Sequence, residues 1–165
     1  QEVGAFVLTR VNLEIERKFL VDGDFSSSIL SSQRIRQGYI SLDPEPTVRV
    51  RVAGDQGSLT IKGAADFSGR MRYEWERELA INEASELMTL CLPGRIEKIR
   101  HRVGFGGNIF EVDEFLGENT GLVLAEIELA AVDQVFDRPG WLGTEVTGVL
   151  KYYNSALTKN PVLSW

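Results

Sequence analysis

Residues 12–21 read NLEIERKFLV, and charged and apolar side chains alternate along this run. In a β-strand, residues i and i+2 point to the same face, so Glu14, Glu16 and Lys18 share one face. The intervening Ile15 lies on the opposite face. The segment therefore predicts a strand with one strongly charged face. Alternation does not say which face is inside, because a half-buried sheet also turns its charges to water.

The same alternation recurs along most of the chain, between turn signals rich in Gly, Pro and Asp. Most gaps are hairpin-sized, which favours antiparallel order because parallel strands need long crossovers. Short helices are predicted near 24–32, near 82–91 with Asn82 as N-cap, and near 151–158. This pattern predicts a β-barrel or strongly curved sheet with peripheral helices. The predicted strands span 12–21, 34–42, 47–53, 57–62, 70–81, 95–103, 108–116 and 121–130.

Paired charges occur on nearly every predicted strand, and the strands divide by sign. Strands 47–53, 57–62 and 95–103 are basic, whereas 108–116 and 121–130 are acidic. If the sheet closes, interior charges are tolerated only when they are paired with opposite charges, metal or ligand. Carboxylates suit Mg²⁺ or Mn²⁺, and Arg and Lys suit phosphate oxygens. A charged lumen would therefore match a metal-bound polyphosphate, while an ordinary sheet with charges outward remains the alternative.

Composition limits the classes of function. The 165 residues include 24 acidic and 18 basic residues, and the net charge of −6 argues against general binding of nucleic acid or anionic membranes. Cys91 is the only cysteine and His101 the only histidine, which excludes a disulfide framework and His-rich zinc sites. With no export signal apparent, we expect a cytoplasmic protein. Residues 1–10 look unlike the rest of the chain and are interpreted as a tail, with a single domain over 11–165.

The pentapeptide EIERK at 14–18 resembles the ExExK signature of the CYTH superfamily, also called triphosphate tunnel metalloenzymes. Further segments resemble the blocks of its short bacterial members in the same order, so the resemblance spans about 12–161. It implies an α+β, mainly β domain: an eight-stranded antiparallel β-barrel that forms a tunnel, with a few peripheral helices. The blocks are RQGYIS at 36–41, TVRVR at 47–51, TIKG at 60–63, RYEWE at 72–76, EKIRHRV at 97–103, EVDEF at 111–115, LAEIEL at 124–129, and WLGTEVTG and KYYNSAL within 141–157.

The resemblance also implies roles for individual residues. Tyr39 matches a tyrosine that assists Lys18 in catalysis. Lys18 as a base would need a depressed pKa, yet Glu14 and Glu16 on its face raise it. The implied metal ligands are Glu14, Glu16, Glu126 and Glu128, joined by Asp113 and Glu76. The implied phosphate-binding residues are Lys18, Arg49, Arg51, Lys62, Arg72, Lys98 and Arg100, with Lys151 from the C-terminal helix.

The resemblance implies hydrolysis of a triphosphate with Mg²⁺ or Mn²⁺. Inorganic triphosphate, cleaved to pyrophosphate and phosphate, is the expected substrate because the short chain has no extra domain to recognise an organic group. Alternatives on the same scaffold are a thiamine triphosphatase, a nucleoside triphosphatase and a class IV adenylyl cyclase. A non-catalytic polyphosphate-binding module and a structural β-domain also stay open. No nucleic-acid or membrane partner is expected, and a homodimer is compatible with the sequence.

Overall fold

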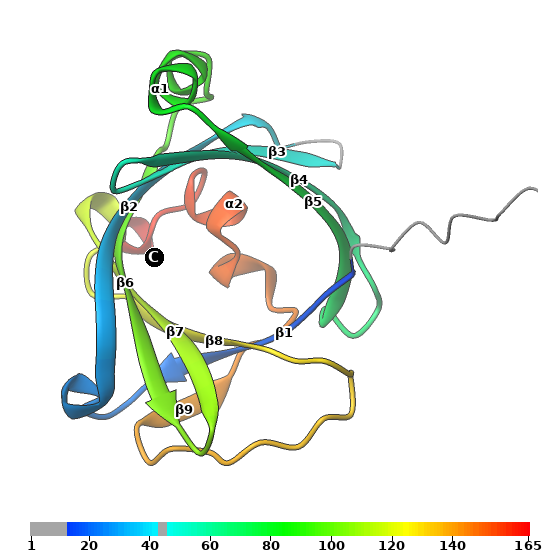
Figure 1. Cartoon of the computed structure of the whole chain (residues 1–165), viewed down its shortest axis with the longest axis vertical. Helices are drawn as coiled ribbons and strands as arrows, with labels where there is room; N and C mark the ends of the chain where they lie inside the picture. Colours follow the sequence, from blue (N-terminus) through cyan, green and yellow to red (C-terminus); the bar gives the residue numbers. More distant parts are fainter. Residues whose placement is uncertain (1–12, 43–45) are drawn as a thin grey trace, which may run out of the picture.

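The computed structural model describes residues 13–42 and 46–165, and a ring of strands dominates it (Figure 1). The described residues form one sheet of nine strands in which neighbouring strands are antiparallel. Helices are short and lie between or after the strands. The strands are β1 (Leu13–Val21), β2 (Ile29–Ser41), β3 (Thr47–Ala53), β4 (Gln56–Ala65), β5 (Met71–Leu79), β6 (Ile96–Phe105), β7 (Asn108–Phe115), β8 (Val123–Glu128) and β9 (Leu142–Glu145), and the α-helices are α1 (Ile81–Thr89) and α2 (Asn154–Leu157).

The sheet closes into the predicted eight-stranded barrel. Its strand order is β5-β4-β3-β2-β6-β7-β8-β1, and a second pairing between β1 and β5 completes the ring. In that closing pair Glu14 lies opposite Arg72. The short strand β9 adds to the end of β1, where Val21 pairs with Leu142. Closure gives every barrel strand two neighbours and makes one face of the sheet the interior.

The main apolar core lies outside the barrel wall. Phe19, on the outer face of β1, packs in a buried cluster with Phe110 and Ile127 of β7 and β8. Trp141 covers this cluster, in the connection between β8 and β9 that runs along the outside of the ring (Figure 1). Because the apolar positions of the alternating strands are covered from outside, the charged positions are left to face the lumen.

Helix α1 covers a second part of the outer wall. Val50 and Val52 of β3 are buried with Ala84 and Met88 of the helix. The contact is close, since a Cβ added to Gly57 would lie 2.5 Å from the Ala84 Cβ. A side chain at this glycine would therefore push the helix away from β4.

One end of the lumen is filled with apolar side chains. Leu20, Ile96 and Leu124 share the inner face with the charged residues of their strands but lie toward the other end. They pack with Leu157 of α2 and with Val146. Figure 1 shows α2 inside the ring of strands. The charged part of the lumen is therefore a cavity backed by this apolar cluster and not an unobstructed bore.

Several details of the predicted elements are corrected. The helix expected over 24–32 is a single 3₁₀ turn, Ser26–Ser28, followed by β2. Asp24 does accept the Ser26 backbone N–H at 2.8 Å, but pairing with β6 extends the following residues as a strand. Helix α1 begins at Ile81, and Glu83, not Asn82, closes its first turn by accepting the Ala80 N–H. Strand β9 was not predicted.

The expected C-terminal helix over 151–158 is divided into a 3₁₀ turn, Leu150–Tyr152, and the short helix α2. Residues 1–10, interpreted from sequence as a tail, lie outside the described residues. Within the described ranges, no helix is both long and apolar enough to span a bilayer.

Candidate active site

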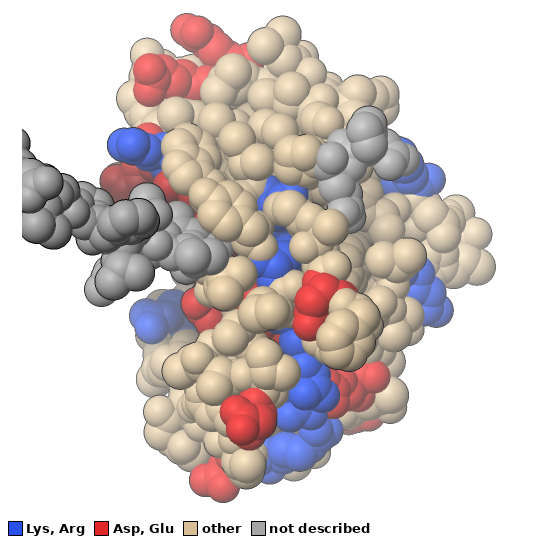
Figure 2. Space-filling model, turned by 90° about the vertical axis from the view of Figure 1, so that its right-hand side faces the viewer, with Lys and Arg blue, Asp and Glu red and all other residues tan. Residues whose placement is uncertain are grey.

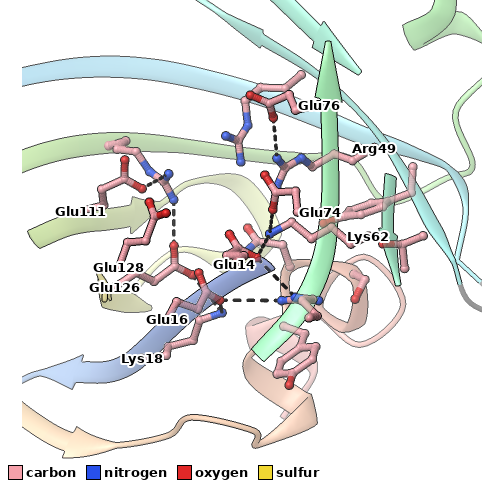
Figure 3. Close-up of a pocket in the computed structure, with 18 of the residues that line it drawn as sticks. Glu14, Glu16, Lys18, Arg49, Lys62, Glu74, Glu76, Glu111, Glu126 and Glu128 are labelled. Atoms are coloured by element: carbon pink, nitrogen blue, oxygen red, sulfur yellow. Dashed lines mark hydrogen bonds and ion pairs between the residues drawn. The ribbon is translucent and has the colours of Figure 1, made fainter. Parts of the chain in front are cut away.

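The charged half of the lumen forms a cavity of about 360 Å³. All eight barrel strands contribute side chains to its lining, and residues 153–155 add to it from the C-terminal segment. Figure 3 shows carboxylates and ammonium and guanidinium groups from different strands pointing into this common space. On the molecular surface, Lys and Arg side chains lie along the middle of one face with acidic side chains beside them (Figure 2).

Most of the residues predicted from sequence meet in this cavity. Lys98 and Asp113 are fully buried beside it and do not line it. Lys151 lies elsewhere, with its ammonium 4.4 Å from the centre of the Trp165 ring, because the 3₁₀ turn that carries it turns it outward. The predicted residues that line the cavity are Glu14, Glu16, Lys18, Tyr39, Arg49, Arg51, Lys62, Arg72, Glu76, Arg100, Glu126 and Glu128.

Ion pairs connect strands that are distant in sequence. Lys62 of β4 contacts Glu14 of β1 and Glu74 of β5, each at 2.6 Å. Arg72 of β5 lies 3.5 Å from Glu14 and 3.7 Å from Glu16. The contacts of Lys62 and Arg72 with β1 follow from the closing pair of strands, which places the inner faces of β1 and β5 side by side, whereas Glu74 is the cross-strand partner of Lys62 in the β4–β5 pair.

Lys18 is buried between two carboxylates. Its Nζ lies 2.9 Å from Glu126 Oε1 and 3.9 Å from Glu16 Oε1. Burial opposes a charge on Lys18, but these carboxylates outweigh it and raise the pKa of Lys18 well above its ordinary value. Lys18 therefore carries a positive charge at neutral pH in this arrangement, the direction expected from Glu14 and Glu16 on its own strand.

A second ion-pair network joins β6, β7 and β8. Arg100 donates to both oxygens of Asp113 at 2.7 Å and to Glu126 at 3.1 Å, and it also pairs with Glu111. Lys98 donates to the same Asp113 at 2.6 Å. Burial alone would raise the pKa of Glu126, yet Lys18 and Arg100 hold it well below its ordinary value. Glu126 is thus ionised and shared between cations.

The two arginines of β3 differ in their partners: Arg49 pairs with Glu76 at 3.4 Å, whereas Arg51 has no carboxylate partner within the described residues. Within the described residues, Arg51 donates hydrogen bonds only to the neutral Gln37 Oε1, at 3.1 and 3.0 Å. Burial, together with Arg49 and Arg100, lowers the pKa of Arg51 to about 9. Because arginine stays protonated in proteins, this lowering marks a site where an anion would be stabilised. The Arg49 Nε is buried without a hydrogen-bond partner in the described part of the chain.

The opposite side of the cavity has a surplus of carboxylates. Burial and the nearby Glu126 raise the pKa of Glu16. Burial, Glu14 and Glu111 raise the pKa of Glu128. Within residues 13–42 and 46–165, no three acidic side chains are arranged around one point as metal ligands. Their oxygen atoms and mutual repulsion nevertheless fit a hard divalent cation, which would relieve that repulsion.

Several cavity residues were not among the predicted site residues. Glu74 and Glu111 share an inner strand face with Glu76 and Asp113, so the i, i+2 rule would have found them. Tyr153 and Asn154 could not be found this way, because they enter the lumen with the C-terminal segment. The Tyr153 ring centre lies 5.3 Å from Lys18 Nζ and from the Arg72 guanidinium carbon, within the range of cation–π contacts.

Comparison with known proteins agrees with this geometry. An inorganic triphosphatase of Acetivibrio thermocellus is 50% identical over 149 residues, which cover 90% of this chain and 94% of the relative. An inorganic triphosphatase of Nitrosomonas europaea is 34% identical over 148 residues, covering 87% and 95%. The crystal structure of the inorganic triphosphatase NE1496 matches 88% of this chain and 93% of its own, with a TM-score of 0.65 and 32% identity.

The family assignment rests on a match that spans nearly the whole chain. The model of the CYTH domain matches residues 12–159, which include all nine strands and α2. Triphosphatases of this family depend on a metal in general. The chain belongs to the CYTH domain family.

Proposed function

We propose that this protein hydrolyses inorganic triphosphate to pyrophosphate and phosphate, with Mg²⁺ or Mn²⁺. The observation that carries the proposal is the division of one cavity into under-paired guanidinium groups and surplus carboxylates. A triphosphate has about four negative charges near neutral pH, so a cluster of cations is needed to hold it. The names of the two triphosphatase relatives support the same substrate.

The cations of the cavity would bind the phosphate chain. Arg51 and Arg49 offer guanidinium groups that lack full pairing, and guanidinium matches phosphate oxygens in a forked geometry. Lys62 and Arg72 would supply further positive charge. Phosphoryl transfer depends mainly on positioning and charge stabilisation, which a ring of fixed cations provides.

The carboxylates would hold the divalent cation. Glu14, Glu16, Glu126 and Glu128 line one continuous part of the wall, because Glu16 pairs with Glu128 across β1 and β8. Glu76 would join them from β5. A divalent cation there would neutralise phosphate charge and activate water. Because Lys18 and Lys62 pair with these carboxylates, an incoming phosphate chain would draw the ammonium groups away and free oxygen ligands for the metal.

Asp113, which the sequence resemblance implied as a metal ligand, has a positioning role in this proposal. It is buried and already accepts hydrogen bonds from Lys98 and Arg100, so it would orient these cations and leave metal binding to the glutamates. Lys151 is omitted because it lies outside the cavity. Tyr39 lines the cavity opposite Arg49 in the β2–β3 pair and is retained as a catalytic candidate beside Lys18. A cytoplasmic location and a homodimer stay predictions.

One assay tests the proposal. The protein is incubated with tripolyphosphate, ATP or thiamine triphosphate, with Mg²⁺, Mn²⁺ or a chelator, and phosphate, pyrophosphate and cyclic AMP are measured. We expect fastest release of phosphate and pyrophosphate from tripolyphosphate, and none with chelator. Preference for ATP or thiamine triphosphate, or formation of cyclic AMP, would contradict the substrate assignment. Tight binding of tripolyphosphate without turnover would indicate a binding module instead.

A further inference from the structure

At the base of the cavity lies a chain of hydrogen bonds through two neutral amides, Gln37 behind the wall and Asn154 in the lining. Gln37 Oε1 accepts from Arg51, Gln37 Nε2 donates to Asn154 Oδ1 at 3.2 Å, and Asn154 Oδ1 also accepts from Lys98 Nζ at 3.1 Å. Gln37 is completely buried. These contacts join β2, β3, β6 and α2 at the base of the charged cavity.

The orientation of both amides is set by their neighbours. Arginine and lysine can only donate, so an amide oxygen must face Arg51 and another must face Lys98. The Gln37 NH₂ group then donates to Asn154 Oδ1, and this oxygen accepts hydrogen bonds from both Gln37 and Lys98. No other arrangement of the two amides satisfies these donors equally well, so the network fixes the Gln37 side chain.

The charges around these amides do not balance. Asp113 accepts from both Lys98 and Arg100, so its negative charge is already shared between two cations. Arg51 receives only the partial negative charge of an amide oxygen within the described part of the chain. A glutamate at position 37 would have nearly the same shape but would neutralise Arg51. The neutral amide therefore orients the guanidinium without cancelling its charge.

We propose that Gln37 is a positioning residue that holds Arg51 toward the cavity and leaves its positive charge free to bind a phosphate group. This inference rests on the proposed function, because it assigns Gln37 a part in binding the triphosphate. Gln37 has no direct contact with the cavity, since it does not belong to the lining. Its effect on the substrate must pass through its two lining partners, Arg51 and Asn154, and the proposal assigns that effect to Arg51.

Two substitutions separate charge from orientation. Gln37→Glu keeps the shape and adds a negative charge, whereas Gln37→Met removes all three side-chain hydrogen bonds without adding charge. Binding of tripolyphosphate is measured by calorimetry in chelator, and KM and kcat are measured with Mg²⁺. We expect Kd and KM to rise roughly tenfold or more in Gln37→Glu, and less in Gln37→Met, with a much smaller change in kcat.

A double-mutant cycle tests whether the effect passes through Arg51. Gln37→Met is made in wild type and in Arg51→Met, and binding is measured in all four proteins. We expect Gln37→Met to weaken binding only where Arg51 is present. An equal loss in both backgrounds would overturn the inference. If Gln37→Glu lowers the melting temperature too far for assay, this cycle decides the question alone.

The outcomes also separate the inference from the proposed function. If wild type neither binds nor cleaves tripolyphosphate, the proposed function fails and the inference falls with it. If wild type binds tripolyphosphate and Gln37→Glu binds it equally well, only the inference is overturned.

Discussion

Lys18 Nζ lies 2.9 Å from Glu126 Oε1, and the two residues are also direct cross-strand partners between β1 and β8. This pair brings together the first strand of the barrel and the last, which are more than 100 positions apart in the chain. It combines a proposed phosphate-binding cation with a proposed metal ligand in one contact. The protonation state of each of these two residues therefore depends on the charge of the other.

The first prediction concerns the chemical role of Lys18. Its pKa is raised by Glu126 and Glu16 against the effect of burial, so it acts as a fixed positive charge. Lys18→Arg preserves that charge, whereas Lys18→Met removes it. We expect Lys18→Arg to retain measurably more tripolyphosphatase activity than Lys18→Met. Equal loss in both variants, together with loss of a basic limb from the pH profile, would indicate a general base instead.

The second prediction concerns Glu126. Glu126→Gln should strongly reduce metal-dependent activity. It should also destabilise the fold by about 3 kcal/mol, because Lys18 and Arg100 lose the charge that pairs them. Urea unfolding and phosphate release measure the two effects. Glu118→Gln, on an exposed 3₁₀ turn, is the matched control and should match wild type in both.

The loss in free energy of unfolding caused by Glu126→Gln should depend on pH. The folded-state pKa of Glu126 lies well below its ordinary value of 4.5, so its ionised form stabilises the fold above about pH 4.5. That contribution is lost as pH falls through the lowered pKa. The stability difference between wild type and variant should therefore be constant near neutrality and shrink in acid. A difference that grows on acidification would contradict the ion-pair assignment.

The period of two predicted which side chains share a strand face, and the resemblance to the CYTH superfamily predicted that the sheet closes with the charged face inside. Closure puts one face of each strand inside the barrel. Pairing of β1 with β8 then places Glu16 beside Glu128 and Lys18 beside Glu126 on that inner face. Residues that reach the cavity by another route could not be predicted. Tyr153 and Asn154 enter it through packing of Leu157 against the far end of the lumen, which no local pattern encodes.

The third prediction concerns Glu128, which separates metal binding from stability. Burial and repulsion by Glu14 and Glu111 raise the pKa of Glu128, so its ionised form is unfavourable without a cation. Glu128→Gln should weaken Mn²⁺ binding, measured by calorimetry, and leave the melting temperature of the metal-free protein equal or higher. A clear drop in the metal-free melting temperature would show that Glu128 is a structural partner instead.

The fourth prediction concerns Arg51. Arg51→Ala removes a guanidinium that has no carboxylate partner in the described part of the chain, so substrate binding should suffer more than stability. We expect KM for tripolyphosphate to rise roughly tenfold or more, the cost of a charge-assisted contact. Arg77→Ala, on the outer face of β5 beside Trp75, is the matched control and should leave KM unchanged. A wild-type KM in Arg51→Ala would place the phosphate chain elsewhere.

The location of metal and phosphate is measured most directly by a crystal structure with Mn²⁺ and tripolyphosphate, in a variant too slow to cleave it. Anomalous scattering locates the manganese without ambiguity. We expect manganese beside Glu16, Glu126 or Glu128, with phosphate oxygens on Arg49 and Arg51 inside the barrel. Manganese and tripolyphosphate bound outside the lumen, with the carboxylates still paired to Lys18 and Lys62, would contradict it.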